Sequence, residues 1–120
     1  MKATIRQFHS PDADLDTYVS ADPADDALFI QMFVGPADGD GEESFDLIVC
    51  TPRWLAREAS TRGPIVGRHH LIVDSLDIPI ALDFLRARVA EATAPTWHEL
   101  ALQLGRIGKW EFEDYRETPS

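Results

Sequence analysis

The chain has 120 residues, 44% of them hydrophobic, and a formal net charge of −10, which predicts one globular domain over residues 1–120. The charge disfavours nucleic acid and anionic membranes as partners, because like charges repel. No apolar stretch approaches the length of a membrane span and the single cysteine cannot form an internal disulfide, so we expect a protein of the bacterial cytoplasm.

Three strands are predicted in the first half of the chain. Residues 3–8 alternate between apolar and polar, and a loop rich in Asp, Pro and Ser follows over residues 9–26. Residues 27–34 are apolar on both alternating faces, and residues 44–50 read as the next strand. Because residues 35–41 between them are dense in turn formers, we predict a hairpin with an acidic tip.

Thr51-Pro52 is a helix-start signal, since Thr caps free backbone N–H groups and Pro has none to leave unpaired. It predicts a helix over residues 53–60, with Trp54 and Leu55 against the sheet.

The remaining elements alternate between strand and helix. Residues 68–73 read as a strand, and apolar residues at steps of three or four predict a helix over 77–93. A capping box formed by Thr96 and Glu99 starts another helix. Residues 110–115 alternate again and suggest a short final strand or an extended segment.

This order, β-β-β-α-β-α-α-(β), predicts an α+β fold. We expect a largely antiparallel sheet of four to five strands with about three helices packed on it.

Metal-binding motifs fail at the positions where coordination geometry is strictest. Asp12, Asp14 and Asp16 have the spacing of the start of a calcium loop, but Thr17 stands at the sixth position and Pro23 at the twelfth. The acids of residues 38–43 fail in the same way. His69 and His70, on a strand, would point to opposite faces and could not bind one metal together. We therefore expect neither a metal nor another cofactor.

No catalytic set stands out in the sequence. Cys50 precedes a helix start, which would slightly lower its pKa, but a buried structural cysteine is the stronger expectation. The serines lack a nucleophile-elbow motif, and no glycine loop is followed by the residues that bind phosphate. We expect no catalytic residues and no enzyme; a small enzyme using Cys50, His69 and His70 remains the weaker alternative.

The negative charge is unevenly distributed. Residues 1–46 hold eleven acidic residues against two basic ones, whereas residues 47–120 are nearly balanced. The acids form three groups, in the loop of residues 12–26, at the hairpin tip over residues 38–43, and over residues 111–114. Such a field speeds encounters with a basic protein.

Five segments, in series, resemble blocks of the immunity protein 8 family of bacterial polymorphic toxin systems. They are Phe8-His9-Ser10-Pro11-Asp12, Gly41-Glu42-Glu43-Ser44-Phe45-Asp46, Val49-Cys50-Thr51-Pro52-Arg53-Trp54-Leu55, Gly67-Arg68-His69-His70-Leu71-Ile72-Val73 and Gly105-Arg106-Ile107-Gly108-Lys109-Trp110-Glu111-Phe112-Glu113-Asp114-Tyr115. They span almost the whole chain.

The resemblance implies a small α+β cytoplasmic protein, encoded next to a toxin, that protects the cell by binding the toxin domain. It supplies no catalytic residues. A nucleic-acid mimic and a general protein-interaction module are the alternatives, and the toxin could be a basic nuclease.

We expect two kinds of partner-binding residue, rim charges and aromatic anchors. The rim charges are Asp38, Asp40, Glu42, Glu43, Glu111, Glu113 and Asp114. The anchors are Trp110 and Tyr115.

Overall fold

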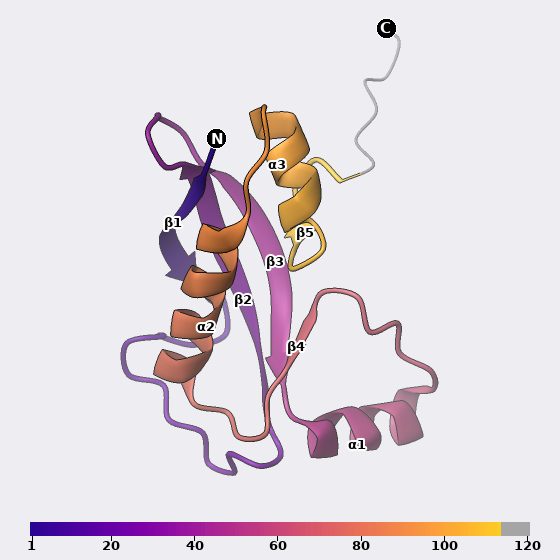
Figure 1. The fold of residues 1–120 in the computed structure, drawn as a ribbon. Helices are drawn as coiled ribbons and strands as arrows, with labels where there is room; N and C mark the ends of the chain where they lie inside the picture. The colour runs from indigo at the N-terminus through magenta and orange to yellow at the C-terminus, as the bar shows by residue number, and fades with distance from the viewer. Residues whose placement is uncertain (114–120) are drawn as a thin grey trace, which may run out of the picture.

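The computed structural model describes residues 1–113, and its α+β element order confirms the predicted fold (Figure 1). The strands are β1 (Ala3–His9), β2 (Ala27–Pro36), β3 (Glu43–Cys50), β4 (His70–Ile72) and β5 (Lys109–Trp110). The helices are α1 (Pro52–Arg62), α2 (Ile78–Glu91) and α3 (Trp97–Leu104). None of these helices is long and apolar enough to cross a bilayer.

The sheet is largely antiparallel, as predicted. Its strand order is β1-β2-β3-β4, and β5 also pairs with β3. On the side of β3 away from β2, β4 pairs in parallel from Ile48 to Cys50, and β5 pairs antiparallel at Phe45 and Asp46. The long β2–β3 hairpin therefore forms the centre of the sheet, and two short strands share one edge.

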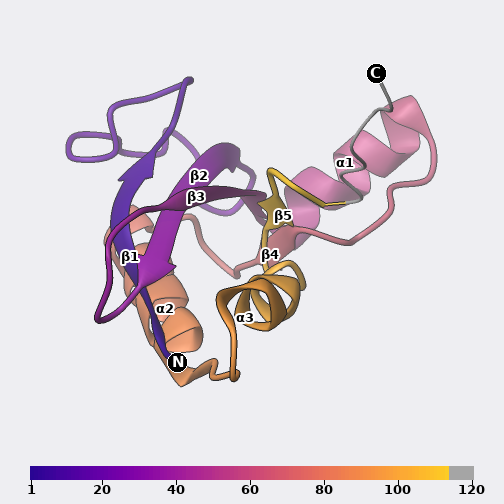
Figure 2. The same ribbon diagram turned by 90° about the horizontal axis from the view of Figure 1, so that it is seen from above.

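Two helices cover one face of the sheet. In Figures 1 and 2, α2 and α3 lie on the same side of the strands. The alternation of β2 and β3 sends every second side chain into the core beneath these helices. The largest side chains of this core with almost no exposure are Phe45, Ile30, Met32, Leu47, Leu85, Leu100 and Leu104.

Helix α1 differs from its prediction in where it lies. Thr51 caps it as expected, accepting from the Trp54 backbone N–H at 3.4 Å. However, α1 has no buried residue, and Trp54 and Leu55 are only half-buried. Figure 2 shows α1 extending beyond the strands rather than across them, so the expected packing of these two side chains against the sheet is wrong.

The predicted last strand is shorter than expected. It ends at Trp110, and a turn over residues 111–113 follows. Helix α3 starts as the capping box predicted: the Glu99 backbone N–H donates to the Thr96 hydroxyl at 3.2 Å. The Glu99 carboxylate accepts from the Thr96 hydroxyl at 3.3 Å, rather than from the Thr96 backbone N–H as a capping box would have it.

Candidate functional site

The acidic hairpin tip is held in shape by a base from another strand. The guanidinium of Arg6, on β1, donates to the carbonyl oxygens of Pro36 at 2.8 Å, of Gly41 at 3.3 Å and of Gly39. A side chain at Gly35 would place its Cβ 2.0 Å from the Gly41 oxygen, so only glycine permits this close approach. Arg6 therefore braces the turn through its backbone.

The carboxylates of the tip stay at the surface. Asp38, Asp40 and Glu42 are exposed, while Glu43 is half-buried. Because Arg6 binds carbonyl groups, it leaves the Asp38 and Asp40 side chains without an ion pair among the described residues. The tip thus presents negative charge in a defined loop, which is the arrangement that attracts a basic surface.

Glu42 and Glu43 turn in different directions. The Gln7 side chain, on β1, donates to the Glu42 carboxylate at 3.3 Å. The Trp110 indole N–H donates to the Glu43 carboxylate at 2.6 Å. Two adjacent expected rim charges are therefore tied to opposite edges of the sheet, one to β1 and one to β5.

The tip also borders a recess with an aromatic wall. Its volume is about 330 Å³, and its lining residues are Pro36, Asp40, Gly41, Glu42, Glu43 and Trp97. Sequence analysis placed Trp97 on the apolar stripe of its helix, but as the first residue of α3 it is only half-buried. Carboxylates beside an indole suit a lysine or arginine side chain, which combines ion pairing with a cation–π contact.

Trp110, expected as an aromatic anchor, is a core residue. It is 8% exposed and stacks on Phe45 with ring centroids 6.4 Å apart. His98 and Phe112 meet its ring edge-on, each at 5.7 Å. A binding role for Trp110 stays a prediction, although the ring is largely covered in the free protein, and Phe112 is 39% exposed beside it.

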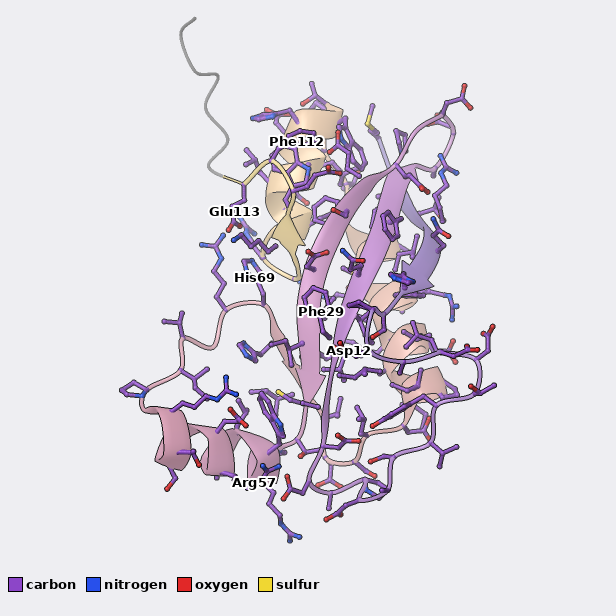
Figure 3. The ribbon with its side chains drawn as sticks, turned by 180° about the vertical axis from the view of Figure 1, so that it is seen from behind. Asp12, Phe29, Arg57, His69, Phe112 and Glu113 are labelled. Atoms are coloured by element: carbon purple, nitrogen blue, oxygen red, sulfur yellow. The ribbon has the colours of Figure 1, made fainter. Side chains whose placement is uncertain are left out.

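The third acidic group folds back onto the sheet. The Glu111 carboxylate accepts from the Ser44 backbone N–H at 2.7 Å. Glu113 pairs with Arg68 at 2.9 Å and lies 3.5 Å from His69 (Figure 3). Glu111 is therefore brought close to the tip end of β3, whereas Glu113 joins a basic group. Asp114 and Tyr115, the other expected binding residues, lie outside the described residues.

The described acids are spread along the molecule rather than clustered at one point. The loop of residues 10–26 leads into the start of β2, and the hairpin tip follows the end of the same ten-residue strand. At a rise of about 3.3 Å per residue, these ends are roughly 30 Å apart. In the loop, Asp25 pairs with Arg57 at 2.7 Å, and Asp26 accepts from Ser20 at 2.6 Å. These two acids therefore have local structural partners.

The potential catalytic side chains have ordinary structural environments. Cys50 is fully buried, and burial raises the pKa of its thiol to about 11, opposite to the slight lowering expected from the nearby helix start. His69 Nε2 lies 2.7 Å from the Gly105 carbonyl oxygen, and His70 Nδ1 lies 3.0 Å from that of Arg68. Within residues 1–113, no group of three or more His, Cys, Asp or Glu side chains could hold a metal ion.

Comparison with known protein families identifies a match over almost the whole chain. The family model described as "Immunity protein 8" matches residues 3–115, which include every described strand and helix. No curated protein and no solved structure matches the chain significantly.

Proposed function

This chain belongs to the immunity protein 8 family, and on that premise we propose that it binds a cognate toxin in the cytoplasm and neutralises it without catalysis. The family match over residues 3–115 is the observation that carries the proposal. An immunity protein of this kind acts by occupying its partner, so it needs a complementary surface rather than a reactive group.

The electrostatics support a basic partner. Of the ten net negative charges, nine belong to residues 1–46. The braced tip presents Asp38, Asp40 and Glu42 to solvent, and Glu111 lies against the same end of β3. Charges of this kind raise the association rate with an oppositely charged protein. Nucleases bind phosphate backbones through basic surfaces, so a nuclease toxin domain fits this field best.

The chemistry of the buried thiol supports a non-catalytic role. A thiol with a pKa of about 11 is neutral at physiological pH and has no solvent access at Cys50. Reaction with a substrate would require the thiolate at a surface. The enzyme alternative therefore has no support from this residue.

A nucleic-acid mimic is the second candidate, and the placement of the acids argues against it. A mimic needs carboxylates along one face, at the spacing of phosphates. Here the loop of residues 10–26 and the hairpin tip lie at opposite ends of β2, and Asp25 and Asp26 are engaged within the protein.

Co-expression with the toxin encoded by the adjacent gene tests the proposal. We expect cells producing both proteins to grow, and the two proteins to co-purify as a complex. A Cys50→Ala variant should protect equally well, because the thiol has no role. Cells that die as fast with the protein as without it, together with the absence of a complex, would disprove the proposal.

A further inference from the structure

One face of the sheet has no helical cover. Both α2 and α3 lie on the other side, and Figure 3 looks onto the face without helices, where Phe29 lies near the middle and Asp12, from the loop of residues 10–26, lies beside it. We call this surface the open face. It is formed by alternate residues of the two central strands, Phe29, Gln31 and Phe33 of β2 and Ser44, Asp46 and Ile48 of β3.

The strand register pairs these six residues across the two strands. Phe29 lies opposite Ile48, Gln31 opposite Asp46, and Phe33 opposite Ser44. All six side chains are half-buried. The solvent face of an antiparallel sheet ordinarily carries polar side chains, so two phenylalanines and an isoleucine there form an apolar surface of the kind that marks interaction sites.

Asp46 is the acid within this apolar surface. Burial, and to a smaller extent the Glu111 charge, raise the pKa of its carboxyl group; a hydrogen bond with Gln31 and the Lys109 charge act in the opposite direction. Its Oδ1 atom is buried and accepts no hydrogen bond from the described residues. The free protein therefore keeps a carboxylate in a setting that disfavours its charge, which is a feature of functional sites.

The surroundings of the open face are more acidic than basic. Glu42 borders it through Gln7, which lies opposite Phe33 in the β1–β2 register. Glu111 borders it through the Ser44 backbone N–H. The nearby base is Lys109, opposite Asp46 in the β3–β5 register. Apolar contact area that contains the Asp46 carboxylate and is bordered by two further carboxylates and one ammonium complements a basic protein surface that contains some apolar residues.

We propose that the open face is the surface that docks the toxin, with Phe29 and Phe33 as the apolar contacts and Asp46 as the partner of a toxin lysine or arginine. This rests on the proposed function and names its binding surface. An arriving cation would compensate the buried carboxylate, and removal of water by the partner would strengthen their attraction. The acidic tip then lies at one end of the interface, where it steers the approach.

Binding measurements with purified proteins test the assignment. The probe is the toxin domain encoded by the adjacent gene, carrying a substitution that abolishes its activity. We expect Asp46→Asn to weaken its affinity about tenfold or more, as for a central interface charge. Asp83→Asn is the matched control, because Asp83 is exposed on α2, on the covered side of the sheet. It should bind as tightly as the wild type.

The melting temperature distinguishes an effect of the substitution on folding from an effect on binding. Asp46→Asn should melt at a higher temperature than the wild type at neutral pH, because it removes a carboxylate that burial disfavours. Weaker binding by a more stable protein would assign the loss to the interface. Phe29→Ala supplies an independent test and should also weaken binding.

The outcomes distinguish the two proposals. If the wild type forms no complex with the toxin domain, the proposed function fails. If the wild type binds and the folded Asp46→Asn and Phe29→Ala variants bind equally well, the proposed function stands and the open face is not the docking surface. If Asp83→Asn weakens binding as much as Asp46→Asn does, the interface is not confined to the open face and the assignment is wrong.

Discussion

Asp46 and Cys50 lie four residues apart on β3, and burial raises the pKa of both. Each group is therefore easier to keep neutral in the folded protein than in the unfolded chain. For Cys50 this has no cost at physiological pH, because a thiol is neutral there. For Asp46, burial does have a cost at physiological pH, because a carboxyl group is ordinarily charged there. The difference separates a structural residue from one whose presence a binding role would explain.

The pH dependence of stability should show the cost at Asp46. Its raised pKa means that the folded state takes up the proton at a higher pH than the unfolded chain does. Proton uptake by Asp46 therefore stabilises the folded state at low pH. This stabilisation is complete below the pKa of Asp46 in the unfolded chain, near pH 4, and is lost as the pH rises through its pKa in the folded protein. We therefore expect Asp46→Asn to exceed the wild type in melting temperature at pH 7, by a margin that shrinks towards pH 4. Thermal melts across this range measure the margin, and one that grows on acidification would contradict the expectation.

Among the elements, α1 and α3 have well-formed caps but contribute differently to the core. Helix α3 buries Leu100, Ala101 and Leu104, whereas α1 buries no residue. Hydrogen bonds at a helix start are local, so the sequence predicts both starts equally well. Packing depends on where the chain leads next: β3 passes directly into α1 at the end of the sheet, which directs this helix beyond the strands.

The cap of α3 should have a measurable effect on stability. Thr96→Ala removes the hydroxyl that accepts from the Glu99 backbone N–H, so we expect the free energy of unfolding to fall by about 1 kcal/mol. Thr61→Ala is the control: Thr61 is exposed in the last turn of α1, and its hydroxyl donates only to the Arg57 carbonyl oxygen at 2.9 Å. Urea denaturation compares the two. Equal losses would mean that the cap of α3 contributes nothing specific.

Across the whole molecule, the acidic hairpin tip lies apart from most of the apolar surface. The exposed acids of the tip lie at one end of the central hairpin, and the open face, with Asp46 within it, lies along the strands beyond them. A long-range field governs encounter, whereas contact across desolvated side chains governs how long a complex lasts. The fold therefore places the residues expected to steer a partner apart from those expected to hold it.

Reversing charges at each end of the hairpin should reveal which end steers. We expect Glu42→Lys with Glu43→Lys to slow association with the toxin domain several-fold at low salt, and to reduce its dependence on salt. Asp16→Lys with Asp22→Lys makes the same change in net charge away from the tip, in the loop of residues 10–26, where both acids are exposed. Stopped-flow association at increasing ionic strength measures both variants. Equal slowing by the two would show that net charge, and not the tip, controls the encounter.

Several features of the fold and site could be predicted residue by residue. Alternation located the strands, helical spacing located α2, and Thr-Pro and Thr-x-x-Glu located two helix starts, because each signal depends on groups a few residues apart. The acidic character of the hairpin tip was also evident from the sequence. Asp46 was not among the expected binding residues, although an acid between Phe45 and Leu47 is a signal that its side chain faces away from the core.

The sequence by itself determined the element order, the α+β class, the family and the uneven negative charge, because these depend on local pattern and composition. Only the tertiary structure decided which acids lie together, that Trp110 is covered while Trp97 borders a recess, and that one face of the sheet lacks a helix. Those features depend on contacts between residues far apart in the chain, such as Glu43 with Trp110. Strand register and helix placement create these contacts, and no local pattern encodes them.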